Sequence, residues 1–132
     1  MNDVLIADND RAVSGLLTEV LERRGVRADH AFDGEAARRL ARREGLAVLI
    51  CDLDMPLASG IDVLESLSDL ANPPAVVVIS GYLDARVEQQ LARLPFVREV
   101  LRKPFDLLRF AETVVSLVAA AQPAGCRPGN ER

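Results

Sequence analysis

The sequence predicts one α/β domain, a doubly wound parallel sheet of five strands with five helices, and three observations support this fold class. Short apolar runs alternate with segments of helical periodicity five times between residues 3 and 121. Two of the runs, 46–51 and 75–79, are continuously apolar, which is typical of strands buried on both faces of a parallel sheet. The connections are short, which favours right-handed crossovers with helices on both faces. We therefore expect the strand order 2-1-3-4-5, the common order for five strands.

The first predicted strand, residues 3–7, ends at an acidic turn that contains Asp8 and Asp10. Asp10 is a suitable N-cap for a helix over residues 11–24, because its side chain can accept hydrogen bonds from the first free backbone amides. Gly25 then ends this helix. Its apolar residues fall at helical spacing on one face, which we expect to pack on the sheet: Val13, Leu16, Leu17, Val20 and Leu21.

The second and third strands follow in the same way. Residues 26–31 alternate apolar and polar side chains, as an edge strand does, and we expect His30 to be a solvated residue on it. A helix over residues 33–45 comes next and turns its apolar side chains inward: Ala36, Ala37, Leu40 and Ala41. The strand over 46–51 runs directly into Asp52. This carboxylate is therefore predicted at the carboxyl edge of the sheet, where open α/β folds place their active sites.

The remaining elements repeat this pattern. A third helix begins near Ile61 and ends near Ala71, strand 75–79 ends at Ser80, and a fourth helix covers residues 83–94. Strand 97–101 leads to Lys103 and to a last helix over residues 106–121. That helix is expected to direct six residues toward the core: Leu107, Leu108, Ala111, Val114, Val115 and Val118. We expect the domain to occupy residues 1–121, followed by a flexible tail over 122–132.

Composition bounds the function. The chain has 132 residues, is about half hydrophobic and carries a net charge of -4, which indicates a globular domain rather than a nucleic-acid or anionic-membrane binder. The N-terminus has no basic region or apolar signal segment, and no stretch has the length of a membrane helix. Cys51 lies in an apolar run and Cys126 in the tail, so we predict no disulfide framework and a cytoplasmic location.

Four strand ends supply polar side chains: Asp8, Asp52, Ser80 and Lys103. In the 2-1-3-4-5 order the first and third strands are neighbours, so Asp8 and Asp52 are expected roughly 5 Å apart, the normal strand spacing. Two carboxylates this close repel each other unless a cation or a proton lies between them, and hard oxygen ligands suit Mg²⁺. A carboxylate nucleophile beside Mg²⁺, with a hydroxyl donor and an ammonium group, is suited to phosphoryl transfer.

At these positions the chain resembles the receiver domains of two-component response regulators, whose fold is flavodoxin-like. The resemblance covers nearly all of residues 3–121 and depends on four motifs: the initial VLIADND, the block Asp52-Leu-Asp-Met-Pro56 with Gly60, Ser80-Gly81, and Lys103-Pro104-Phe105. Together these motifs are a specific signal, although each alone is weak.

The resemblance implies a role for each residue. Asp52 would accept a phosphoryl group from a sensor histidine kinase or a histidine phosphotransfer protein. Ser80 would be the switch hydroxyl, and Lys103 would form a salt bridge to the phosphate. Asp8, Asp52 and the main-chain carbonyl of Asp54 would bind Mg²⁺, with Mn²⁺ as the alternative ion.

Two positions depart from the family pattern. Asn9 stands where the family usually has a second acidic residue, so we keep Asn9 in the predicted ligand set but expect weaker metal binding. Val100 lies three residues before the lysine, where many receivers have Tyr or Phe, and Tyr82 is the nearby aromatic residue that could gate the phosphate. The resemblance also implies a cis peptide bond before Pro104.

The resemblance further implies a signalling domain, not an enzyme, that catalyses only its own phosphorylation and dephosphorylation. A downstream protein target would bind a face made by the fourth helix, the fifth strand and the fifth helix, and a homodimer is left open. No direct nucleic-acid or membrane partner is expected. Because the residues after 121 are too few to fold alone, we expect a single-domain regulator or a receiver whose output domain lies on another chain.

Three alternatives compete with this interpretation. The first is a receiver-like module that binds partners without phosphorylation, and Asn9 is the only evidence for it. The second is an Asp-nucleophile phosphatase, because Asp52-x-Asp54 resembles the loop of haloacid-dehalogenase-type enzymes; that family places the pair after its first strand and generally adds a cap domain. The third, a flavin binder of the same fold, would need its phosphate loop at residues 8–10, where acidic side chains would repel phosphate.

Overall fold

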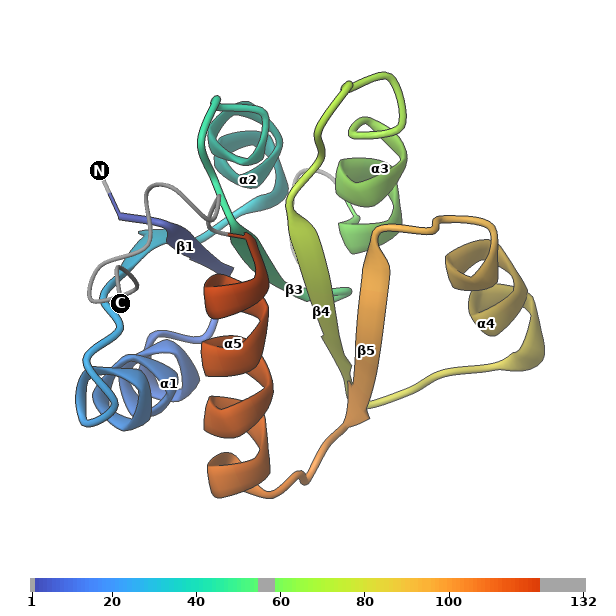
Figure 1. Ribbon diagram of the computed structural model, residues 1–132. Helices are drawn as coiled ribbons and strands as arrows, with labels where there is room; N and C mark the ends of the chain where they lie inside the picture. Colours follow the sequence, from blue (N-terminus) through green and yellow to red (C-terminus); the bar gives the residue numbers. More distant parts are fainter. Residues whose placement is uncertain (1, 55–58, 122–132) are drawn as a thin grey trace.

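The computed structural model describes residues 2–54 and 59–121, and its elements alternate strand and helix as predicted (Figure 1). In chain order they are β1 (Val4–Ala7), α1 (Arg11–Glu22), β2 (Ala28–Ala31), α2 (Gly34–Ala41), β3 (Val48–Asp52), α3 (Gly60–Glu65), β4 (Ala75–Ser80), α4 (Ala85–Ala92), β5 (Val97–Arg102) and α5 (Leu107–Ala121). The predictions that concern Met55, Pro56, Cys126 and the tail at 122–132 lie outside the described residues.

The five strands form one sheet in the order β2-β1-β3-β4-β5, which confirms the predicted topology. Every neighbouring pair is parallel. All five carboxyl ends therefore lie at one edge of the sheet, and β2 and β5 are its outermost strands.

Helices cover both faces of this sheet (Figure 1). α1 and α5 lie side by side on one face, where Leu17 and Phe110 share a buried cluster with Ile6. α2, α3 and α4 lie on the other face, where Val63 belongs to a second cluster with Leu5. Successive residues of β1 thus enter opposite cores. This is the two-residue period of a strand buried on both sides, and it explains why the central strands are continuously apolar.

Aspartate side chains cap the starts of three helices, one of them predicted from the sequence. Asp10 accepts hydrogen bonds from the amides of Ala12 and Val13, which confirms it as the N-cap of α1. Asp33 and Asp84 accept hydrogen bonds in the same way at the starts of α2 and α4. None of the helices within the described residues has the length and apolar character needed to cross a bilayer.

The inward direction predicted for two leucines is wrong. Leu16 on α1 is 53% exposed and Leu108 on α5 is 62% exposed. Leu17 and Leu21 lie on the face of α1 that packs against the sheet, whereas Leu16 lies on a different face of the helix. Each helix therefore buries a narrower stripe than the apolar residues of its sequence suggest.

The ends of some elements also differ from the prediction. α2 ends at Ala41 and not at Gly45, and α3 ends at Glu65 and not near Ala71. In both cases the residues that follow form turns. Gly45 has a φ of +87°, a left-handed conformation that glycine adopts without strain, so it serves the turn into β3 and not the helix.

The prediction that His30 is solvated is only partly right, because the residue is half-buried and both ring nitrogens have hydrogen-bond partners. Its Nδ1 atom lies 2.6 Å from Ser14 Oγ and its Nε2 atom lies 2.9 Å from Thr18 Oγ1. The alternation in the sequence places His30 on an edge strand correctly, but α1 packs against β2 and supplies a partner for each ring nitrogen.

Candidate functional site

The carboxyl edge of the sheet gathers the polar residues that the sequence singles out. β1 and β3 are in register with Ala7 opposite Cys51, so Asp8 and Asp52 follow at the same level on neighbouring strands. Ser80 ends β4, and Lys103 follows directly after β5. The peptide bond between Lys103 and Pro104 is cis, as expected.

Asp52 is buried and has a partner for each carboxylate oxygen. Oδ1 accepts a hydrogen bond from the Asp54 amide at 2.8 Å, and Oδ2 accepts one from Lys103 Nζ at 2.9 Å. Partial burial alone would lower the pKa of Lys103, but the hydrogen bond and the charge of Asp52 outweigh it and raise that pKa. The ammonium group is therefore held charged beside the buried carboxylate.

Asp8 is also buried, at 1% exposure, but only one of its oxygens is paired. Oδ1 accepts a hydrogen bond from the Asp10 amide at 2.8 Å. Oδ2 has no hydrogen-bond partner among the described residues. Burial, with the neighbouring charge of Asp52 as a further contribution, raises the pKa of Asp8 to about 6. At neutral pH the edge thus holds a buried negative charge that the protein does not fully compensate.

Ser80 is completely buried, and its hydroxyl is engaged with the loop that follows β4. Oγ donates a hydrogen bond to the carbonyl of Tyr82 at 2.6 Å and accepts one from the Tyr82 amide at 3.1 Å. The Tyr82 side chain itself is 73% exposed. The topology brings Ser80 to the predicted edge, but its hydroxyl is hydrogen-bonded to the main chain of Tyr82 and not to Asp52.

The other two predicted metal ligands, Asn9 and Asp54, are less enclosed than Asp8 and Asp52. Asn9 and Asp54 are both exposed, and the amide of Asp54 is the part that contacts Asp52. Within residues 2–54 and 59–121, no three or more His, Cys, Asp or Glu side chains come together as a metal site. A cation here would therefore have two buried carboxylates and otherwise neutral oxygens.

Gly60 has a structural role that the sequence reasoning did not find. A Cβ atom at this position would lie 2.5 Å from Leu53 Cα and 2.8 Å from the carbonyl oxygen of Asp52. The Gly60 amide also donates to the Leu53 carbonyl at 3.1 Å. Glycine here lets the start of α3 approach the backbone that carries Asp52. An isolated glycine just before a predicted helix is the signal that could have indicated such a close approach.

Cys51 lies next to Asp52 but has no part in this chemistry. It is fully buried and belongs to an apolar cluster. Burial, with the charges of Asp52 and Asp8, raises the pKa of its thiol far above the ordinary value, so the residue is an unreactive core side chain.

Comparison with known proteins agrees with this fold. The sequence model of the response regulator receiver domain matches residues 4–115. Transcriptional regulatory protein CpxR of Escherichia coli (strain K12) is 36% identical over 106 residues, which are 80% of this chain but 44% of CpxR. The chain therefore spans less than half the length of that curated relative.

Solved structures support the same conclusion. The Francisella response regulator 1452 receiver domain superposes with a TM-score of 0.81 at 24% identity, over 92% of this chain and 100% of that one. A response regulator from Burkholderia pseudomallei, crystallised with a phosphorylated aspartic acid, a calcium ion and citrate, gives a TM-score of 0.71 at 25% identity, over 92% of this chain and 75% of that one.

Receiver domains are signalling modules that interact with histidine kinases and downstream effectors. Because the family match extends from the first strand well into α5, this chain belongs to the response regulator receiver domain family.

Proposed function

We propose that this chain is a phosphoacceptor in which Asp52 receives a phosphoryl group from the phosphohistidine of a sensor histidine kinase or a histidine phosphotransfer protein. The observation that carries the proposal is the placement of Asp52. It is buried at the carboxyl edge of the sheet, paired with Lys103 and level with Asp8 on the next strand. Open α/β folds bind their ligands at this edge.

The transfer is a displacement at phosphorus. A carboxylate oxygen of Asp52 forms the new O–P bond, and the bond from phosphorus to the donor nitrogen breaks with its electron pair returning to the imidazole. Lys103, which already donates to Asp52 Oδ2, is placed to neutralise charge on the phosphoryl oxygens. The amide of Asp54 orients the carboxylate through Oδ1.

The donor set fits Mg²⁺, with Mn²⁺ as the alternative. Asp8 Oδ2 is a buried carboxylate oxygen without a partner among the described residues, and such an oxygen is suited to a hard cation. Asp8, Asn9, Asp52 and the main-chain carbonyl of Asp54 would hold the ion. When bound, it would neutralise charge on the transferred phosphoryl group. The Burkholderia relative, with its phosphorylated aspartic acid and calcium ion, supports this proposal by analogy.

Ser80 would act as the switch. Its hydroxyl must release the Tyr82 carbonyl before it can donate to a phosphoryl oxygen, so phosphorylation would displace the loop after β4. Tyr82 lies in this loop and its ring is exposed, so we propose that it gates access to the phosphate and expect Tyr82→Ala to change the dephosphorylation rate. The decay of the phospho-form can be followed by mass spectrometry, and an unchanged lifetime would remove the gating role.

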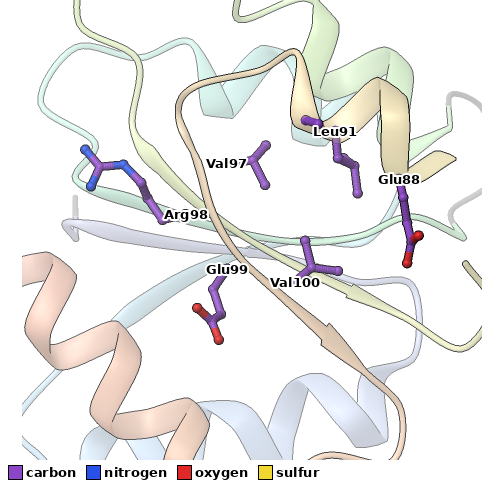
Figure 2. Close-up of a pocket in the computed structure, with 7 residues that line it drawn as sticks. Glu88, Leu91, Val97, Arg98, Glu99 and Val100 are labelled. Carbon is purple, nitrogen blue, oxygen red and sulfur yellow. The ribbon is translucent and has the colours of Figure 1, made fainter. Parts of the chain in front are cut away.

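In this proposal the face for a downstream partner consists of α4, β5 and α5. α4 buries only Leu91 among its eight residues, which makes it weakly anchored. A cavity of about 350 Å³ lies against α4 and β5, and Figure 2 shows Leu91 and Glu88 from the helix with Val97 and Val100 from the strand. Arg102 of β5 pairs with Glu88 at 2.5 Å across the same region. Displacement of the Ser80 loop would move α4 and alter this surface.

The direct test is intact mass after incubation with acetyl phosphate, with and without Mg²⁺. We expect the gain of one phosphoryl group, dependent on Mg²⁺ and abolished in Asp52→Asn. A gain that persists in Asp52→Asn would contradict the assignment of the phosphoacceptor.

A second candidate is a receiver-like module that binds its partner without phosphorylation. The observation that favours it is the neutral, exposed side chain of Asn9 at the carboxyl edge of the sheet, where the family usually has a second acidic residue. If neither phosphorylation nor Mg²⁺ binding occurs in the wild-type chain, this second function takes precedence. A cytoplasmic location and binding to a downstream protein target are part of the proposal in either case.

A further inference from the structure

We infer that His30 is a positioning residue that, as the neutral Nε2–H tautomer, fastens α1 to β2 and thereby fixes the acidic loop at residues 8–10. The group that does this, the His30 clamp, consists of Arg11, Ser14 and Thr18 on α1 with His30 and Phe32 at the end of β2. The inference rests on the proposed function only where it concerns metal binding.

The directions of the hydrogen bonds assign the tautomer. The Thr18 hydroxyl donates its single hydrogen to the Ser14 carbonyl at 2.8 Å, so toward His30 it can only accept. Nε2 of His30, 2.9 Å from Thr18 Oγ1, must therefore carry the ring hydrogen. Nδ1 is then the acceptor, and the buried hydroxyl of Ser14 donates to it at 2.6 Å. The opposite neutral tautomer would need the Thr18 hydroxyl to donate to Nε2, which would leave Thr18 Oγ1 and the Ser14 carbonyl oxygen 2.8 Å apart with no hydrogen between them.

Aromatic and cationic contacts extend the clamp to the start of α1. The rings of His30 and Phe32 stack with centroids 5.7 Å apart and planes 6° from parallel. The guanidinium carbon of Arg11 lies 3.9 Å from the Phe32 ring centroid, a cation–π contact. Arg11 is the first residue of α1 and Thr18 lies about two turns later. The clamp therefore holds the first half of this helix against β2.

The acidic loop lies between the two parts that the clamp joins. The amide of Asp8 donates to the carbonyl of Ala31, the residue between His30 and Phe32, at 3.0 Å. On its other side, Asp8 Oδ1 accepts from the amide of Asp10, the N-cap of α1. Asp8 is thus tied both to the end of β2 and to the start of α1. A shift of α1 against β2 would strain or break one of these bonds.

The experiment uses NMR and matched variants of Thr18 in the full chain. His30 is the only histidine of the sequence, so its ring nitrogen signals are assigned without ambiguity. At pH 8 we expect the Nε2–H tautomer in the wild type. Thr18→Val, which removes the acceptor, should speed exchange of the Asp10 amide about fivefold, the factor that corresponds to one net hydrogen bond. Thr18→Ser, which keeps the hydroxyl, should restore the wild-type rate.

Thr113→Val on α5 controls for a general loss of stability, because Thr113 lies on a helix outside the clamp. An Nδ1–H tautomer, or an Asp10 exchange rate in Thr18→Val equal to that of Thr113→Val, would overturn the clamp. Mg²⁺ titrations separate this result from the proposed function. A wild type that binds no Mg²⁺ counts against the metal site alone, and the amide measurement still decides the clamp. Equal Mg²⁺ affinity in the wild type and in Thr18→Val would overturn the role of the clamp in placing Asp8.

Discussion

Replacing Asp8 with Asn should stabilise the metal-free protein at neutral and alkaline pH. The pKa of Asp8 is about 6 in the fold against an ordinary value of 3.8, so the folded state binds the proton more tightly than the unfolded chain does. At 1.36 kcal/mol for each pH unit, ionisation of Asp8 destabilises the fold by at most about 3 kcal/mol above pH 6. An Asn side chain keeps an oxygen that can accept from the Asp10 amide but carries no charge.

The pH dependence gives the sign of the effect. As the pH falls from about 7 to about 4, the wild type takes up this proton and regains the stability that ionisation removes. Asp8→Asn should therefore exceed the wild type by up to about 3 kcal/mol at pH 8, and the difference should shrink to near zero at pH 4.

Urea unfolding followed by circular dichroism, at five pH values with a chelator present, measures this difference. Asp3→Asn is the matched control, because Asp3 is an exposed carboxylate at the other end of β1 and its replacement should change the free energy of unfolding by less than about 0.5 kcal/mol. A variant Asp8→Asn that is no more stable than the wild type at pH 8 would refute the reasoning. So would a stability difference that does not depend on pH.

Three further predictions concern other parts of the fold. Gly60→Ala should lower the free energy of unfolding by about 1–3 kcal/mol because its Cβ meets backbone atoms. Gly15→Ala, whose Cβ meets nothing within 4 Å, should raise it by about 1 kcal/mol. Urea unfolding measures both changes, and two changes of the same sign would contradict this prediction. Asn9→Asp should tighten Mg²⁺ binding in a calorimetric titration, and unchanged affinity would remove Asn9 from the ligand set. Burial opposes the ionisation of Asp29, but a backbone hydrogen bond and the charge of Arg43 outweigh it and lower the pKa of this residue. Its contribution to stability is therefore present above about pH 4 and lost on further acidification. In Asp29→Asn this loss should be missing from the free energy of unfolding measured against pH.

The sheet order and the residues at its edge could be predicted because they depend on few features. Continuous apolar runs fix which strands are central, and the alternation of strand and helix fixes the parallel topology. Once the order is known, the residue after each strand must lie at the carboxyl edge. Asp8 and Asp52 are therefore placed by topology alone, without knowledge of any side-chain contact.

Features that depend on side-chain partners could not be predicted in the same way. The alternation of β2 is the same whether His30 faces water or α1, and the apolar residues of α1 do not show which of them lies outside the packed stripe. A signal was nevertheless present. Ser14 lies three residues before Leu17, with Thr18 next to it, so the buried side of the helix carries hydroxyl groups. A hydroxyl on that side needs a hydrogen-bond partner, and the half-buried ring of His30 is that partner.

The two carboxylates at the edge are stabilised unequally, and this inequality connects stability with the proposed function. Both carboxylate oxygens of Asp52 are hydrogen-bonded, one of them to the ammonium group of Lys103, whereas Asp8 has one oxygen without a partner among the described residues. Folding therefore buries a charge that a neutral Asn at the same position would avoid. A local cost of this kind is expected at a site whose compensating charge arrives with a ligand. Without metal, Asp8→Asn should therefore be more stable than the wild type. With Mg²⁺ present, the variant should lose the stabilisation that the ion gives the wild type. Both effects, of opposite sign, should arise from the same oxygen atom of Asp8.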